Sequence, residues 1–328
     1  MRRDIVDLAK DFIVQLHKRK LARGTKGPLI CGVSGPQGSG KTTLCGQLIK
    51  KLTSSPYSLN VVAFSTDDLY LPYESQQSLA KLNPRNPLWQ HRGNAGTHDV
   101  DLGRNTLCAL RYINEDENYS VALPRYDKSA YGGKGDQVAK PEWPIVKGPL
   151  DLVLFEGWQV GFPPLTDREL EELVMKTLLS GDGSSHILKY DMDTLKAINK
   201  ASCKYQRYWY DQLDAFIWIQ AQKLDYVYDW RWQQEETLSK RLKKDAEANN
   251  DNKDEKRGSM TREQVVNFVD KFMPGYELHL PKLHKQGFRH TSQMGILKRA
   301  KCPQLTIVLD KQRKVTEFKD NLPGKSRL

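Results

Sequence analysis

Residues 35–42 read Gly-Pro-Gln-Gly-Ser-Gly-Lys-Thr and match the phosphate-binding pattern G-x-x-x-x-G-K-[ST]. Glycines let the backbone N–H groups turn inward around phosphate oxygens, and a following helix adds the partial positive charge of its N-terminus. Lys41 is expected to reach the β- and γ-phosphates of ATP, and Thr42 to offer its hydroxyl to Mg²⁺. The expected nucleotide-binding residues are Gly35, Pro36, Gln37, Gly38, Ser39, Gly40, Lys41, Thr42 and Thr43.

Carboxylates follow two apolar runs further along the chain. Asp67 and Asp68 come after residues 60–64, and Glu156 comes directly after residues 151–155. A carboxylate at such a position can orient an acceptor hydroxyl and receive its proton, or it can cap a turn. Spacing alone leaves both interpretations open for the aspartates. Glu156 is expected to help Thr42 hold Mg²⁺.

The loop alone does not separate a kinase from a GTPase, a motor or a transporter ATPase. The sequence contains neither an Asn-Lys-x-Asp guanine-binding motif nor a Leu-Ser-Gly-Gly-Gln signature, and Glu156-Gly157 replaces the Asp-x-x-Gly motif of GTPases. These observations favour a kinase.

The elements that must position these residues follow from apolar runs and helical periodicity. We expect strands at 28–34, 60–64, 151–155, 216–219 and 305–309, and helices at 3–19, 41–52, 101–113, 167–179, 191–213, 224–248 and 261–272. This alternation predicts an α/β fold of the P-loop NTPase type, with a doubly wound, mostly parallel sheet and helical additions.

We expect residues 1–328 to form a single domain. Its parts are an amphipathic helix and basic loop at 1–26, a core at 27–310 with a mobile, solvated insertion near 245–259, and a basic tail at 311–328.

The chain has 328 residues and a net charge of +11, which is concentrated at its two ends, whereas residues 27–280 are slightly acidic. The ends are interpreted as solvated tails or as a docking patch for an acidic partner, and a nucleic-acid partner is not expected. No apolar run is long enough to span a membrane. Five scattered cysteines without a C-x-x-C pair, and an acidic N-terminal segment, predict a cytoplasmic protein, with nuclear access left open.

Five segments occur in a recognisable order: Gly35 to Thr42, Ser65-Thr-Asp-Asp-Leu-Tyr70, Arg92-Gly-Asn-Ala-Gly-Thr-His-Asp99, Pro124-Arg-Tyr-Asp-Lys-Ser129 and Phe155-Glu-Gly-Trp158. This set resembles the plant and fungal glycerate kinase (D-glycerate 3-kinase) family, a branch of the P-loop kinases related to phosphoribulokinase, uridine kinase and pantothenate kinase. The resemblance covers about 28–283 and includes 228–232 and Met273-Pro-Gly-Tyr-Glu277. Because the chain shows no transit peptide, we expect a fungal-type member rather than the chloroplast form.

The resemblance implies a mononucleotide-kinase-like fold and ATP-dependent phosphorylation of a small hydroxylated acid, D-glycerate to 3-phosphoglycerate in the plant members. It makes Asp67 the expected base. It also places Arg231 where related kinases keep lid arginines that close on the phosphates.

A carboxylate-bearing substrate favours arginine, whose guanidinium fork matches a carboxylate. The candidate substrate-binding residues are Asp68, Arg92, His98, Asp99, Arg125, Tyr126 and Lys128. Asp99 has an equally good interpretation as a helix cap, and Tyr126 as a packing residue. Trp230 and Trp232 are expected to serve helix packing.

We therefore expect a kinase in which Asp67, Lys41 and Arg231 act on the transferred phosphoryl group, while lid closure excludes water. One alternative is a kinase for another small alcohol, such as a sugar, a nucleoside or a pantoate-like acid. Another is an ATP-binding regulatory or scaffold protein. The sequence leaves monomer and homodimer open.

Overall fold

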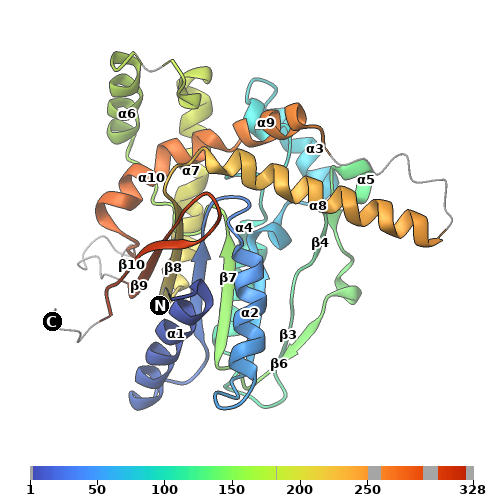
Figure 1. The fold of residues 1–328 in the computed structure, drawn as a ribbon, viewed down its shortest axis with the longest axis vertical. Coiled ribbons are helices and arrows are strands. Elements are labelled where there is room, and N and C mark those ends of the chain that lie inside the picture. Colours follow the sequence, from blue (N-terminus) through green and yellow to red (C-terminus); the bar gives the residue numbers. More distant parts are fainter. Residues whose placement is uncertain (1–2, 182, 250–259, 291–301, 323–328) are drawn as a thin grey trace.

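The computed structural model describes residues 3–181, 183–249, 260–290 and 302–322. A six-stranded sheet with the order β10-β9-β8-β1-β7-β2 forms its centre (Figure 1). The strands are β1 (Leu29–Ser34), β2 (Val61–Ser65), β7 (Leu152–Gly157), β8 (Ala215–Ala221), β9 (Gln304–Leu309) and β10 (Val315–Asp320). The first five are parallel, and β10 is antiparallel to β9. This topology confirms the predicted doubly wound α/β fold.

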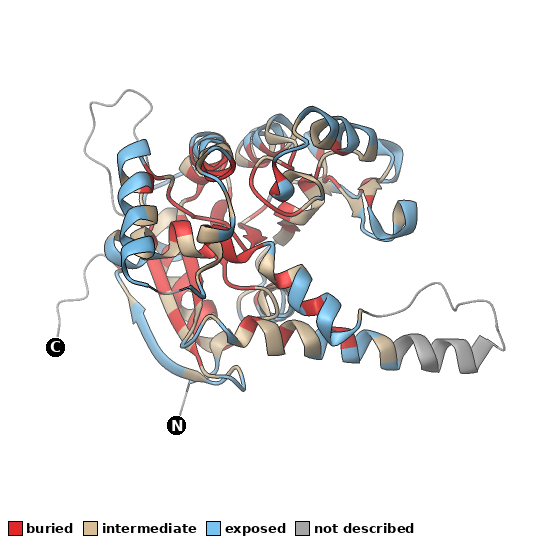
Figure 2. Cartoon of the chain, turned by 90° about the horizontal axis from the view of Figure 1, so that it is seen from above, coloured by how far each residue is buried: buried red, intermediate tan, exposed pale blue. Residues whose placement is uncertain are grey.

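Helices cover both faces of the sheet. On one face, α1 (Ile5–Ala22) and α2 (Lys41–Thr53) lie side by side and pack on Cys31 and Val33 of β1. On the other face, α4 (Val100–Arg111), α7 (Met192–Tyr208) and α10 (Met273–Gln286) pack on the alternate side chains, including Ile30. All six residues of β1 are therefore buried, as expected for a parallel strand covered on both sides. Figure 2 shows this sheet as the buried centre of the molecule.

The remaining elements of the described chain are helices, 3-10 turns and two small strand pairs. The helices are α3 (Tyr73–Leu82), α5 (Ala130–Gly133), α6 (Asp167–Leu179), α8 (Tyr226–Asn249) and α9 (Arg262–Asp270). Short 3-10 turns are η1 (Thr66–Leu69), η2 (Pro87–Trp89), η3 (Lys140–Glu142), η4 (His186–Lys189) and η5 (Tyr210–Gln212). Two small antiparallel pairs join β3 (Ser120–Ala122) to β6 (Ile145–Lys147), and β4 (Tyr126–Asp127) to β5 (Asp136–Gln137). In the described part of the chain, no helix combines the length and apolarity needed to cross a membrane.

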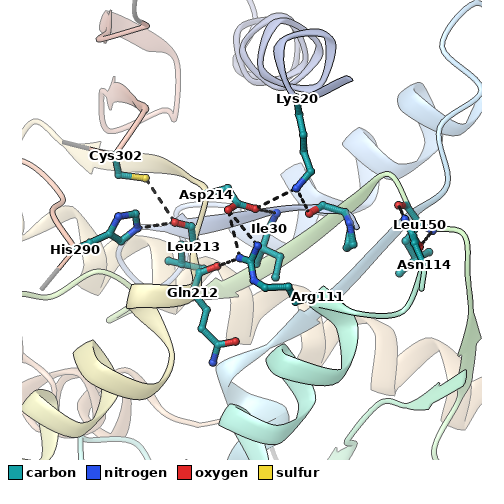
Figure 3. A network of polar contacts seen from close by, with 11 residues as sticks. Lys20, Ile30, Arg111, Asn114, Leu150, Gln212, Leu213, Asp214, His290 and Cys302 are labelled. Carbon is teal, nitrogen blue, oxygen red and sulfur yellow. Dashed lines mark hydrogen bonds and ion pairs between the residues drawn. The ribbon is translucent and has the colours of Figure 1, made fainter. Parts of the chain in front are cut away.

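The opposite end of the sheet is tied together by Asp214, just before β8 (Figure 3). Its carboxylate accepts a 2.9 Å hydrogen bond from the backbone N–H of Ile30 in β1. It also pairs with Arg111 of α4 at 3.3 Å and with Lys20 of α1 at 3.8 Å. One carboxylate therefore links β1, the start of β8 and a helix on each face of the sheet. The phosphate-binding loop lies at the other end of the sheet, after β1.

The C-terminal prediction is wrong for residues 315–320. These residues were expected to belong to a basic tail, but they form β10, which pairs with β9. β10 is an edge strand with four exposed residues, and edge strands often carry charged side chains such as Glu317 and Lys319. The segment therefore lacks the apolar run from which the other strands were predicted. Residues 323–328 lie outside the described residues.

The insertion expected near 245–259 is described only in part. Helix α8 continues to Asn249, so the first residues of that segment are helical. Residues 250–259, and with them most of the predicted mobile insertion, lie outside the described residues.

Candidate active site

The phosphate-binding loop joins β1 to α2, as the sequence predicts. Gly38 and Gly40 have φ angles of +74° and +92°, a conformation that side chains disfavour. The ammonium group of Lys41 and the backbone N–H of Ser39 both donate to the carbonyl oxygen of Pro36, at 3.1 and 3.2 Å. Burial lowers the pKa of Lys41, against the opposing influence of Glu156 and Asp67. The loop therefore directs a half-buried amine and an amide hydrogen at a single oxygen.

The loop fits a nucleotide phosphate on independent grounds. The hydroxyl of Ser39 and the side-chain oxygen of Gln37 are buried and have no hydrogen-bond partner among the described residues. Buried polar groups are nearly always paired in native proteins, so these two indicate a polar ligand at the loop.

The hydroxyl and the carboxylate predicted to hold Mg²⁺ lie beside the loop. The Thr42 hydroxyl donates a 2.7 Å hydrogen bond to Glu156, because β1 pairs with β7 and aligns Val33 with Glu156. Burial raises the pKa of Glu156, while Lys41 and Thr42 lower it. Among the described residues there is no cluster of three or more His, Cys, Asp or Glu side chains that could hold a metal. A hydroxyl and one carboxylate fit Mg²⁺, which keeps waters and phosphate oxygens as its other ligands.

The two neighbouring aspartates have different surroundings. Asp68 accepts a 3.0 Å hydrogen bond from the backbone N–H of Ser65, which caps η1, and pairs with Arg125 at 3.2 Å. Asp67 instead pairs with the ammonium group of Lys128 at 2.5 Å. Asp68 is therefore held by the local backbone, whereas Asp67 is held only by side chains.

Asp67 is the better candidate for a base. Its carboxylate also hydrogen-bonds the side chain of Tyr70. Burial raises the pKa of Asp67, but Lys128 and Tyr70 outweigh burial and hold that pKa below its usual value. Because Ser65 aligns with Glu156 across β2 and β7, η1 and Asp67 begin beside the expected metal site.

His98 is a buried, uncharged donor. The Tyr205 hydroxyl oxygen accepts a 2.8 Å hydrogen bond from the backbone N–H of Gly96, and it lies 2.7 Å from His98 Nδ1. Since Tyr205 then has its hydroxyl hydrogen left to donate, we assign that hydrogen to Nδ1 and the ring proton of His98 to Nε2. Burial lowers the pKa of His98 to about 3, so the ring is neutral. Nε2 has no hydrogen-bond partner in the described part of the chain.

Arg92 and Asp99 contact the backbone in this structure. The guanidinium of Arg92 donates to the carbonyl oxygens of Gly133 at 2.7 Å, of Lys128 at 3.3 Å and of Lys134, and it lies over the ring of Tyr126. Through these hydrogen bonds, Arg92 stabilises the loop that carries Lys128. Asp99 caps α4 by accepting from Leu102 N–H, as its alternative interpretation predicted.

Arg231 does not contact the phosphate-binding loop in any interaction that the structure gives it. It pairs with Glu235 on α8 and lies 5.0 Å from the ring centre of Phe268 on α9. Burial lowers the pKa of Arg231, against the opposing influence of Glu235. The role of a lid arginine stays a prediction. Trp230 is fully buried, which agrees with its expected packing role.

Four residues of the site were missed. Tyr70 and Tyr276 belong to motifs that the sequence analysis quoted, yet they received no role. The hydroxyl of Tyr276 accepts a 3.1 Å hydrogen bond from the backbone N–H of Gln37 in the phosphate-binding loop. Tyr205 and Arg313 carry no local sequence signal, since each contacts the site across more than a hundred residues of chain.

A phosphate-binding loop after β1, with carboxylates at the ends of the two neighbouring parallel strands β7 and β2, defines the class as P-loop kinases. No protein-family model matches the chain. A fission-yeast protein (Schizosaccharomyces pombe) named uncharacterized kinase mug58 is 39% identical over 78% of this chain and 82% of its own length.

Two further similar proteins are named after their substrate. The chloroplastic D-glycerate 3-kinase of Arabidopsis thaliana is 36% identical over 84% of this chain, which spans 53% of the Arabidopsis protein. A solved D-glycerate 3-kinase structure from Cryptococcus neoformans is 34% identical, covers 97% of this chain and 99% of its own, and has a TM-score of 0.80. The chain belongs to the D-glycerate 3-kinase family.

Proposed function

We propose that the protein transfers the γ-phosphoryl group of ATP to a hydroxyl of D-glycerate and so forms 3-phosphoglycerate and ADP. The observation that supports the proposal is the ion pair between Asp67 and Lys128, a carboxylate and a cation that both lie close enough to Lys41 of the phosphate-binding loop to influence its pKa. The names of the Arabidopsis and Cryptococcus relatives support the choice of acceptor.

Residues 35–43 would hold the phosphates of ATP, and Thr42 and Glu156 would hold Mg²⁺. The metal would neutralise charge on the transferred phosphoryl group. The Lys41 ammonium group and the Ser39 amide, which now converge on the Pro36 carbonyl, would turn to phosphate oxygens. Arg231 would add charge neutralisation if closing of α8 moves it toward the phosphates.

Asp67 would accept the proton of the acceptor hydroxyl as the new O–P bond forms. In the structure, the ammonium group of Lys128 forms an ion pair with this carboxylate. A carboxylate on the substrate would compete for the Lys128 ammonium group and free Asp67 to bind the hydroxyl. The same exchange would disfavour a neutral alcohol, which cannot draw Lys128 away.

The acceptor would be recognised by hydrogen-bond donors of this region that have no full set of partners among the described residues. The Arg125 side chain is 41% exposed and uses one nitrogen on Asp68, so further donors are free to bind a carboxylate. The uncharged His98 would donate from Nε2 to an acceptor oxygen. Asp68, Arg92, Asp99 and Tyr126 would shape the pocket through the backbone and ring contacts described above.

The cytoplasm remains our proposed compartment, and the five free cysteines, three of them buried, agree with a reducing environment. We propose neither a nucleic-acid partner nor a membrane partner.

The test is an ADP-formation assay with D-glycerate, L-glycerate, glycerol, pantoate and uridine as acceptors. We expect turnover with D-glycerate, none with glycerol, and a phosphorus NMR spectrum of 3-phosphoglycerate rather than 2-phosphoglycerate. Lys41→Ala should abolish turnover. Equal turnover with glycerol would refute recognition of the carboxylate. ATP binding without turnover on any acceptor would refute the kinase and favour the regulatory alternative.

A further inference from the structure

The turn between β9 and β10 reaches the phosphate-binding loop through one side chain. Arg313 Nε donates a 2.7 Å hydrogen bond to the carbonyl oxygen of Gly38. Its two other nitrogens contact α8, at the carbonyl oxygen of Trp230 and at Oε1 of Gln233, the latter at 2.7 Å. We propose that Arg313 is a positioning residue that orients the Gly38–Ser39 peptide for nucleotide binding and couples it to α8. The proposal rests on the nucleotide site proposed above.

The first step of the argument is peptide geometry. The C=O of one residue and the N–H of the next point to opposite sides of a trans peptide. Because Arg313 holds the Gly38 carbonyl on the outside of the loop, the Ser39 N–H is directed inward. There it donates to the Pro36 carbonyl, the same oxygen that binds the Lys41 ammonium group. Arg313 therefore presents an amide donor to the position that a phosphate oxygen would take.

The second step is the contact between the loop and α8. A Cβ atom at Gly38 would lie 2.6 Å from the Cβ of Trp230 and 2.8 Å from its carbonyl carbon, so the helix backbone packs directly on the loop. The guanidinium of Arg313 lies 5.2 Å from the Trp230 ring centre and bonds both sides of this contact. A movement of α8 is thereby transmitted to the Gly38–Ser39 peptide.

The third step is the backbone of Arg313 itself, which has a φ of +60°. Residues with side chains rarely adopt this conformation, and where it occurs the surrounding structure must hold it. Asp310 does so here: its carbonyl accepts from Arg313 N–H at 2.9 Å, and its carboxylate accepts from the N–H groups of Gln312 and Lys314. The turn is built to hold this arginine in place.

The test compares Arg313→Gln and Arg313→Lys with the wild-type protein. ADP affinity is measured by calorimetry without any acceptor, and KM and kcat are measured for ATP and for the acceptor. We expect both variants to raise the ADP dissociation constant and the KM for ATP about 10-fold, the size of one lost charged hydrogen bond. The acceptor KM should change less than about 2-fold on the same scale.

The matched control is Lys314→Gln, which removes the adjacent exposed cation of the same turn and should leave ADP binding unchanged. If Arg313→Gln lowers the melting temperature but binds ADP as the wild type does, Arg313 only caps Trp230 and the inference is overturned. If the wild-type protein binds no ADP, the proposed nucleotide site itself fails. These two outcomes are therefore distinguishable.

Discussion

The hydroxyl of Thr42 donates a 2.7 Å hydrogen bond to the carboxylate of Glu156. This contact joins the first turn of α2 to the end of β7, because β7 pairs with β1 and the phosphate-binding loop leads from β1 into α2. It also holds together the two oxygens that we propose as Mg²⁺ ligands, so the fold itself sets their relative position.

Glu156→Gln should weaken the response to Mg²⁺ while leaving the fold intact, because the amide preserves the shape of the side chain and removes its charge. We expect the Mg²⁺ concentration at half-maximal activity to rise about 10- to 100-fold. Titration of activity with Mg²⁺ at constant ATP measures this. Glu142→Gln, at an exposed site, is the control. An unchanged titration would remove Glu156 from the metal site.

Asp67→Asn should mainly lower the turnover rate, whereas Asp68→Asn should mainly lower the unfolding free energy. Asp67→Asn removes the base, so kcat should fall by roughly 10²- to 10⁴-fold with ATP affinity retained. Asp68→Asn weakens the cap of η1 and should cost about 1 kcal/mol of unfolding free energy, with most of the turnover kept. Steady-state kinetics and urea unfolding of both variants decide between them. The opposite pattern would assign catalysis to Asp68.

Tyr205→Phe should change His98 without touching the substrate. Loss of the hydroxyl removes the hydrogen bond to Nδ1, so the proton of the neutral ring no longer stays on Nε2. We expect the acceptor KM to rise about 2- to 10-fold, the value of one neutral hydrogen bond, with the KM for ATP unchanged. Nitrogen NMR of the histidine ring reports the tautomer directly.

The control for that experiment is Tyr210→Phe, which removes another buried hydroxyl, bonded to the Gln159 carbonyl. It should cost stability without altering the His98 ring signals. A wild-type-like NMR spectrum and acceptor KM in Tyr205→Phe would show that Tyr205 serves packing alone.

The unfolding free energy should fall as the pH is lowered from about 7 to about 5. Burial lowers the pKa of His98 to about 3 and that of His279 to about 4, below the ordinary histidine value of about 6.5. The unfolded chain therefore binds more protons in this range, and the stabilisation present above about pH 6.5 is lost toward acid pH. Each histidine contributes a slope of at most about 1.4 kcal/mol per pH unit.

Urea unfolding at several pH values tests this expectation, with His279→Gln as the variant. His279 donates to the Pro163 carbonyl and contacts Ser202, so glutamine retains some of its hydrogen bonding. Its pH slope should be shallower than that of the wild type. An identical slope would mean that His279 does not titrate on unfolding.

The nucleotide half of the site was predictable because its signals are local. Lys41 and Thr42 follow a strand and open a helix, and Glu156 was predicted because the carboxyl ends of parallel strands meet at one edge of the sheet. The capping box formed by Ser65 and Asp68 could also have been recognised, and it would have separated Asp68 from Asp67.

The substrate half was harder because it depends on loop conformation. Arg92 was expected to bind a carboxylate, but glycines with positive φ at 132, 133 and 135 shape the loop whose carbonyl oxygens it binds. The contact of Arg313 with the phosphate-binding loop could not be predicted, because Arg313 lies 275 residues from Gly38 and the strand that follows it was not recognised. Neither arrangement has a counterpart in local spacing or periodicity.

The bond between Arg313 and Gly38 joins residues 275 positions apart, and that between Tyr276 and Gln37 joins residues 239 apart. During synthesis on the ribosome, β1 and α2 emerge long before Tyr276 and Arg313, so both bonds can form only after residue 313 has been added. Contacts of such separation form slowly, because a long loop has to close before they add stability. A nascent chain should therefore reach its full nucleotide affinity only after residue 313 has been synthesised.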